Sequence, residues 1–131
     1  MTRKFFVYGT LRGAGIRGGM LEETEYLGEA RVPGEMFSLG AFPAVRLSED
    51  GEVVGEVFEA SEKDFPGLKA QLDWVEGVAG GLYKCKEVDV LMKESGDTVS
   101  CLIYVAGPRI ADGLDDHPRI ESGDWLANRQ S

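Results

Sequence analysis

The chain has 131 residues, with 14 basic and 23 acidic side chains and a net charge of −9 at pH 7. This length accommodates one hydrophobic core, so we expect a single domain over residues 1–131. An acidic chain is a poor ligand for polyanions, which argues against nucleic acid or an anionic membrane as a partner. No apolar run resembles a signal-peptide core or reaches transmembrane length, so we expect a cytoplasmic protein that crosses no membrane.

The first predicted strand, residues 5–8, leads into a glycine-rich loop. Aromatic and β-branched side chains fill all four positions and suit a buried strand. Gly9 ends it and Thr10, Leu11 and Arg12 follow, with further glycines behind them. Backbone N–H groups in such a loop can converge on a carboxylate or phosphate. A plain connection with a flexible tip explains the same residues, and composition alone does not decide between the two.

Three more strands are predicted before the first helix. Residues 26–39 form an extended segment that we expect to bend or bulge at Pro33-Gly34. Residues 42–47 form a short strand, a turn signal follows at 49–52, and the next strand covers 53–60.

One helix is predicted, over about residues 62–76. Ser61 is a suitable N-cap, and Gly77 ends the helix. The apolar side chains recur every three or four residues and therefore form one face: Phe65, Leu68, Leu72 and Val75.

The last two strands, 82–93 and 98–106, form a hairpin around residues 95–97. The apolar positions of the first strand change from odd to even numbers, which predicts a β-bulge near Lys86-Glu87. Cys85 and Cys101 do not face each other across this hairpin, so we expect two free thiols. A turn-rich, acidic tail begins at about residue 107 and is attached to the body by its few apolar residues.

Six strands and one main helix predict the α+β class, with the sheet curled around a small core. A doubly wound parallel sheet would need several alternating helices. The G-x-G-x-x-G at residues 13–18 does not open a long helix, which argues against a nicotinamide or flavin cofactor. Asp112, Asp115, Asp116 and His117 lack a second histidine, so we expect neither a metal nor any other cofactor.

Glu76 is the strongest candidate for chemistry. It lies about 40° from Leu72 around the helix, beside the apolar face, and at the negative end of the helix dipole. Both features favour the protonated carboxyl and raise its expected pKa, which suits proton transfer. A glutamate that reaches water or pairs with Arg12 or Lys84 is the structural alternative. Asp73 points about 100° away from Leu72, so we expect it to matter little.

Two motifs together resemble the γ-glutamylcyclotransferase family, above all its small γ-glutamylamine cyclotransferase-like members. They are Val-Tyr-Gly-Thr-Leu-Arg at residues 7–12, and Leu-Asp-Trp-Val-Glu-Gly at residues 72–77 with Tyr83 seven residues after Glu76. Weaker matches continue to Ile-Glu-Ser-Gly-Asp-Trp at residues 120–125, so the resemblance spans nearly the whole chain.

The resemblance implies a small β-barrel with a cavity at one mouth and an enzyme that uses no cofactor. Such an enzyme converts a γ-glutamyl amine or peptide into 5-oxoproline and a free amine, with Glu76 as general acid and base. Because the substrate's own amine attacks, no Ser, Cys or His nucleophile is required. The implied substrate-binding residues are the loop that holds the α-carboxylate and two wall tyrosines: Tyr8, Gly9, Thr10, Leu11, Arg12, Tyr83 and Tyr104.

Two departures from the family pattern concern the leaving group. Cys85 stands where many members have Arg, and residues 78–81 lack a proline that many members carry. Two other hypotheses fit the same chain. One is a binding module that holds a small carboxylate in the cavity without turnover, and the other is an interaction protein that uses the acidic tail, residues 112–124. The sequence specifies neither the leaving group nor the oligomeric state.

Overall fold

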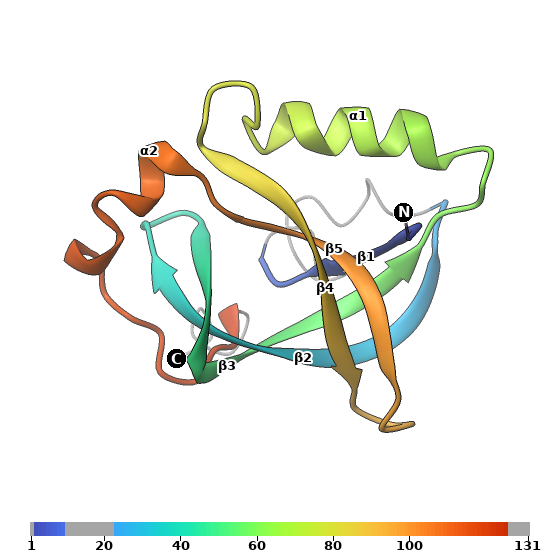
Figure 1. Ribbon diagram of the computed structural model, residues 1–131, viewed down its shortest axis with the longest axis horizontal. Coiled ribbons are helices and arrows are strands. Elements are labelled where there is room, and N and C mark those ends of the chain that lie inside the picture. The colour runs from blue at the N-terminus through green and yellow to red at the C-terminus, as the bar shows by residue number, and fades with distance from the viewer. Residues whose placement is uncertain (1, 10–22, 126–131) are drawn as a thin grey trace.

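The computed structural model describes residues 2–9 and 23–125, and it has the predicted α+β architecture (Figure 1). Five strands close into a barrel in the order β1-β3-β2-β4-β5, with β1 parallel to β5 at the closure. One main helix, α1 (Phe65–Val75), lies along the outside. The strands are β1 (Lys4–Val7), β2 (Glu25–Ser38), β3 (Pro43–Glu59), β4 (Tyr83–Met92) and β5 (Thr98–Ala106). The short helix α2 (Pro108–Ala111) and the 3-10 turn η2 (Leu114–Asp116) follow β5.

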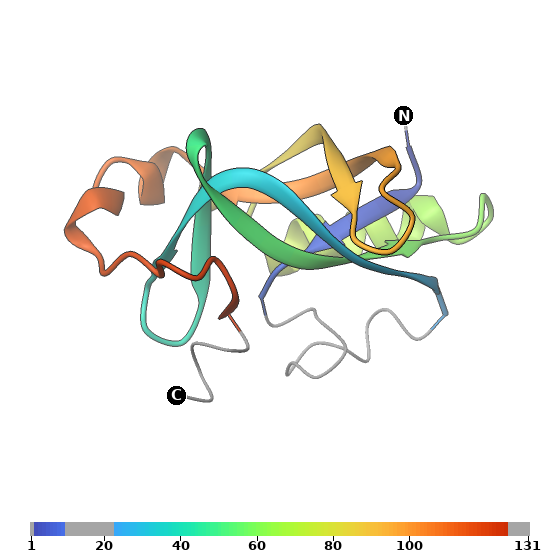
Figure 2. The same cartoon turned by 90° about the horizontal axis from the view of Figure 1, so that it is seen from below.

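Residues 2–9 and 23–125 form five strands where the sequence predicted six, because β3 joins two of the predicted strands. The two halves of β3 pair with β2, and the two strands curve together around the core (Figure 2). Pairing runs from Ser38↔Pro43 to Gly34↔Leu47 and resumes at Pro33↔Glu52. The predicted turn at residues 49–52 is thus a bulge within β3. It lies opposite Pro33-Gly34 in β2, where a register shift confirms the predicted irregularity.

The predicted bulge in β4 is wrong. β4 and β5 pair without interruption from Tyr83↔Ala106 to Leu91↔Thr98. The apolar phase changes because the two ends of β4 bury opposite faces. Cys85 packs in the cluster between the barrel wall and α1, whereas Val88 packs in the barrel interior. A change of buried face and a bulge leave the same pattern in a sequence.

The two cysteines are free, as predicted. Cys85 is paired with Tyr104 across the hairpin, and Cys101 is paired with Val88. The offset of three residues between them keeps the thiols apart.

α1 begins later than the sequence predicted. Its N-cap is Asp64, and Pro66 lies in its first turn, where a missing N–H leaves no hydrogen bond unmade. Ser61 instead forms a turn before the helix, because its hydroxyl accepts a hydrogen bond from the Asp64 N–H at 3.1 Å. Leu72 is fully buried and docks the helix on the barrel.

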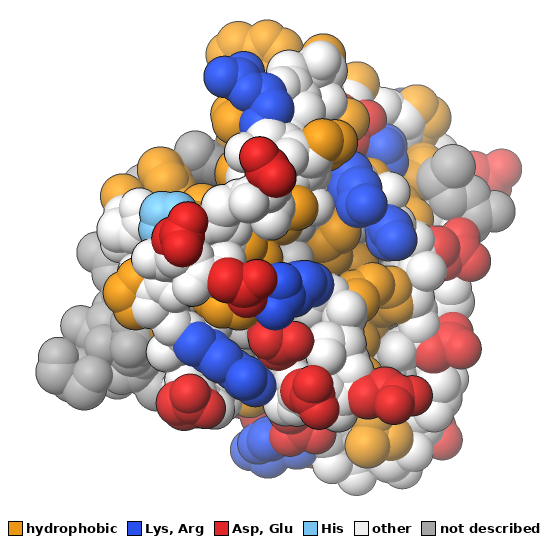
Figure 3. Space-filling model, turned by 60° about the vertical axis from the view of Figure 1, so that its left-hand side comes forward, with side chains coloured by type: hydrophobic (Ala, Val, Ile, Leu, Met, Phe, Trp, Pro, Cys, Tyr) orange, Lys and Arg blue, Asp and Glu red, His pale blue; other side chains and the backbone are white. Residues whose placement is uncertain are grey.

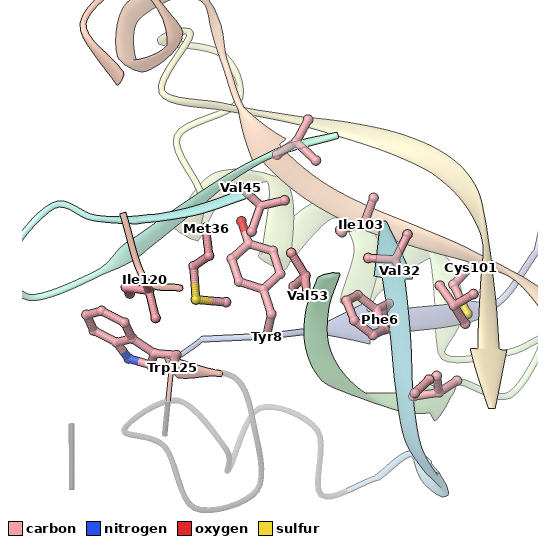
Figure 4. Packing of buried hydrophobic residues seen from close by; sticks show 14 residues of the cluster. Phe6, Tyr8, Val32, Met36, Val45, Val53, Cys101, Ile103, Ile120 and Trp125 are labelled. Atoms are coloured by element: carbon pink, nitrogen blue, oxygen red, sulfur yellow. The ribbon is translucent and has the colours of Figure 1, made fainter. Parts of the chain in front are cut away.

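The tail contributes to the core and is also tied to the barrel by ion pairs. Ile120 and Trp125 lie beside Met36 in the barrel interior (Figure 4). Arg46 contacts both Glu35 and Asp115 at 3.0 Å, and these pairs lower the pKa of each carboxyl. Acidic and basic side chains are interspersed over this face of the molecule (Figure 3). Within residues 2–9 and 23–125, no helix is long and apolar enough to cross a membrane.

We predict that Gly123→Ala destabilises the protein far more than Gly96→Ala. Both glycines have a left-handed φ, +67° and +74°. A Cβ at Gly123 would lie 1.8 Å from the carbonyl oxygen of Glu52, whereas a Cβ at Gly96 would meet nothing within 4 Å. Gly96→Ala should cost about 1 kcal/mol for backbone strain alone. Gly123→Ala should cost roughly 3 kcal/mol, because the tail must also move away from β3. Urea unfolding of both variants measures the difference, and equal costs would contradict the packing of the tail.

Candidate active site

A cavity of about 190 Å³ lies where the C-terminus of α1 meets the ends of β1 and β5 and the start of β4. It is smaller than the pockets of roughly 300–1,000 Å³ that hold drug-sized ligands, so it suits a small molecule. Most of its wall is apolar, and the polar side chains are one carboxyl group and three phenols. The wall includes Tyr8, Gly9, Phe42, Pro43, Glu76, Leu82, Tyr83 and Tyr104.

The structure brings together five of the eight residues proposed from the sequence: Tyr8, Gly9, Glu76, Tyr83 and Tyr104. They lie just after β1, in β4, in β5 and at the end of α1. They are therefore close to one another only in the folded chain. Thr10, Leu11 and Arg12 lie outside the described residues.

Tyr8 and Gly9 follow directly on β1 and form the floor of the cavity. The Tyr8 hydroxyl donates a hydrogen bond to the backbone carbonyl of Tyr104. Burial raises the pKa of Tyr8 well above its usual value, and the charge of Glu76 adds to this, so the phenol stays neutral. Gly9 is required for close packing and not for a left-handed φ, because a Cβ there would lie 2.8 Å from Cγ of Pro43.

Glu76 is the C-cap residue of α1, and its backbone N–H donates to the Leu72 carbonyl at 2.9 Å. Gly77 follows with a φ of +64° and turns the chain away from the helix axis. The carboxyl group of Glu76 acts on two phenols of the cavity, since its charge raises the pKa of both Tyr8 and Tyr104. The one carboxylate of the described cavity wall therefore lies at the negative end of a helix dipole.

Tyr83 connects the two strands that flank the mouth. Its hydroxyl donates to the carbonyl oxygen of Pro43 at 2.7 Å and so joins the start of β4 to the start of β3. Beside it, Phe42 and Leu82 line the cavity and are each 41% exposed. The mouth is thus apolar, while the carboxyl group and phenols lie together at the cavity wall.

Asp73 makes contacts that its position on the helix did not predict. Tyr104 donates its hydroxyl to Oδ1 of Asp73 at 2.6 Å, and Lys69 Nζ lies 2.8 and 2.7 Å from the two carboxylate oxygens. The i, i+4 spacing of Lys69 and Asp73 is visible in the sequence. The contact with Tyr104 is not, because it depends on which flank of α1 faces β5.

The predicted acidic cluster in the tail does not gather into a metal site. Among the described residues, no group of three His, Cys, Asp or Glu side chains is arranged to hold a metal ion. Asp115 instead pairs with Arg46.

The closed barrel has a small cavity at one end of its flanking helix, and the size of this cavity suits a small-molecule ligand. Residues 5–127 match the family described as gamma-glutamyl cyclotransferase, AIG2-like, and the chain belongs to this family. The family resemblance seen in the sequence is thereby confirmed. No curated protein matches the chain.

Solved structures show the same fold. YkqA from Bacillus subtilis is 27% identical with a TM-score of 0.74; the match covers 100% of this chain and 44% of YkqA, so the chain spans less than half of that protein. The ytfP protein of Escherichia coli is 27% identical with a TM-score of 0.65, over 98% of this chain and 99% of its own. A mouse AIG2-like protein is 24% identical with a TM-score of 0.72, and the match covers 94% of this chain and 88% of the mouse protein.

We predict that Gly9→Val weakens binding of 5-oxoproline, the product implied by the family, at least tenfold while the protein still folds. The added side chain meets the Pro43 ring and narrows the cavity floor. Gly67→Val on α1 is the control, because a Cβ there meets nothing within 4 Å. Calorimetric titration measures both affinities. Unchanged affinity in Gly9→Val would remove the end of β1 from the site.

Proposed function

We propose that the protein is a cyclotransferase that releases 5-oxoproline and a free amine from a γ-glutamyl amine or γ-glutamyl peptide. The observation that carries this proposal is the placement of Glu76, the one carboxyl side chain in the described wall of an otherwise apolar and phenolic cavity. Membership of the family supports cyclotransferase-type chemistry. The substrate and the role of each residue are our inference.

The substrate would bind with its α-carboxylate at the end of β1, against backbone N–H groups from Gly9 onward. Tyr8, Thr10, Leu11 and Arg12 complete this proposed loop. The γ-amide would then lie near Glu76, and the leaving amine would point to the mouth. Because Phe42 and Leu82 form that mouth, an amine with an apolar substituent fits it better than a charged one.

The reaction would proceed by proton transfer at Glu76. Its carboxylate removes a proton from the α-ammonium, and the resulting amine attacks the γ-carbonyl carbon to form a new C–N bond. Glu76 then returns that proton to the leaving nitrogen as the original C–N bond breaks. The ring nitrogen gives up its second proton through the same carboxylate to the released amine, which leaves as an ammonium ion. The carboxylate is regenerated, and no covalent enzyme intermediate is formed.

The thiols do not offer a competing mechanism. Cys101 is fully buried in the barrel interior, where desolvation raises its pKa to about 12. Burial also raises the pKa of Cys85, which is absent from the cavity wall. Neither thiol is therefore a ready nucleophile at neutral pH.

We predict that Glu76→Gln lowers turnover by roughly 10² to 10⁴ and leaves substrate binding within a few-fold. Glutamine keeps the shape of the side chain but cannot accept the ammonium proton. Glu62→Gln, on an exposed residue just before α1, is the matched control and should keep full activity. A panel of γ-glutamyl amines and dipeptides is incubated with each protein, and 5-oxoproline is detected by mass spectrometry.

Three other results would each change the interpretation. Full 5-oxoproline release by Glu76→Gln would show that another group moves the proton. A loss of several kcal/mol in unfolding free energy would make Glu76 a structural residue. Binding of γ-glutamyl compounds without any product, by the unmodified protein, would favour the non-catalytic binding module.

A further inference from the structure

All three phenols of the cavity wall have their protons engaged by the protein. The Tyr8 hydroxyl donates to the Tyr104 carbonyl, the Tyr83 hydroxyl to the Pro43 carbonyl, and the Tyr104 hydroxyl to the Asp73 carboxylate. Carbonyl and carboxylate oxygens only accept hydrogen bonds, so each phenol must be the donor. What a phenol can still offer a ligand is an oxygen lone pair.

The described wall of the cavity therefore carries side-chain acceptors and no side-chain donor that is still available. Its polar side chains are the three phenols and Glu76, and it has no Lys, Arg, His, amide or aliphatic hydroxyl. Such a wall favours a donor-rich, positively charged group. The α-ammonium of a γ-glutamyl substrate has three N–H donors and suits this environment.

Tyr104 is the phenol best placed to act together with Glu76. Its hydroxyl donates a hydrogen bond to Asp73. Asp73 precedes Glu76 by three residues, so the two side chains lie on the same flank of α1. Tyr8 is deeper in the barrel interior, and the backbone N–H of Val45 already donates to it. Tyr104 thus shares the cavity wall with Glu76, and the charge of Glu76 acts on its phenol. The Cys85 side chain also hydrogen-bonds to Tyr104, and a phenol oxygen has two lone pairs.

Lys69 and Asp73 fix the direction of the Tyr104 proton. Both oxygens of Asp73 contact Lys69, which leaves the carboxylate an acceptor anchored within α1. Burial, followed by the hydrogen bond to Asp73, raises the pKa of Tyr104 far above its usual value. The phenol accordingly keeps its proton and does not serve as an acid or a base itself.

We propose that Asp73 is a positioning residue that turns the phenol of Tyr104 into a hydrogen-bond acceptor for the α-ammonium group of the substrate. This inference rests on the proposed function, because it assigns part of the γ-glutamyl site. Tyr104 contacts the substrate, and Asp73 acts through Tyr104.

The test compares two ligands that differ only in the α-amine, L-glutamine and glutaramate. Binding is measured by calorimetry in the Glu76→Gln protein, so that turnover does not consume L-glutamine. In the Glu76→Gln protein, the second change Tyr104→Phe should weaken the binding of L-glutamine about tenfold, as expected for a lost hydrogen bond to a charged group. The same change should alter glutaramate binding less than twofold. Tyr26→Phe, at a tyrosine outside the cavity wall, is the control and should alter neither.

Asp73→Asn tests the positioning role, because an amide can donate to the Tyr104 oxygen and reverse the phenol. It should weaken the binding of L-glutamine several-fold and leave the affinity for glutaramate unchanged. In the Tyr104→Phe protein the same Asp73→Asn change should have no further effect, because Asp73 acts through that hydroxyl. If Asp73→Asn weakens L-glutamine binding as much in the Tyr104→Phe protein as it does alone, the positioning role of Asp73 is overturned. If Asp73→Asn does not fold, Tyr104→Phe alone still tests whether the phenol accepts a hydrogen bond from the substrate.

An equal loss for both ligands in Tyr104→Phe, or no loss for either, would overturn the inference. These outcomes differ from a failure of the proposed function. If Glu76→Gln keeps full turnover, the acid and base assignment fails. A rise in KM for L-glutamine in Tyr104→Phe, with an unchanged inhibition constant for glutaramate, then still supports Tyr104. If neither ligand binds any of the proteins, the γ-glutamyl site is wrong and both proposals are overturned.

Discussion

The structure depends on β1, a four-residue strand that is buried on both faces. Phe5 and Val7 pack beneath α1. Phe6 and Tyr8 point into the barrel interior (Figure 4). β1 also closes the barrel, because it pairs with β3 on one side and with β5 on the other. Gly55 makes room for it, since a Cβ at that position would lie 2.5 Å from the Phe6 ring. Because the chain leaves β1 at the cavity floor, closing the barrel also positions the site.

The features that the sequence predicted are those decided within one element. The apolar spacing of α1, the hairpin of β4 and β5, and the bend at Pro33-Gly34 follow from local patterns. The motif around Glu76 likewise placed a carboxyl group at a helix end. Features that depend on which neighbour an element meets were missed. β3 is one strand only because both of its halves pair with β2. Asp73 contacts Tyr104 only because its flank of α1 faces β5.

The hydrogen bonds of the phenols also hold the cavity together. Tyr8 links the end of β1 to β5, Tyr83 links β4 to β3, and Tyr104 links β5 to α1. Each bond joins two different elements at the cavity wall. The wall is therefore fixed before any ligand enters, which reduces the ordering that binding and catalysis would otherwise require. The same three bonds that crosslink the wall also determine which hydrogen-bonding groups it can offer.

Stability and activity are consequently joined in α1. Leu72 anchors the helix in the core beneath it, and Lys69 and Asp73 attach its flank to Tyr104. Glu76 lies one residue beyond the end of the helix, so its position depends on how firmly that last turn is docked. A substitution that loosens this turn would displace the carboxyl group without touching the cavity. A shift of about 1 Å at a reacting group is enough to slow catalysis by roughly a hundredfold. The packing of one helical turn is for this reason as much a part of the proposed site as the residues that line it.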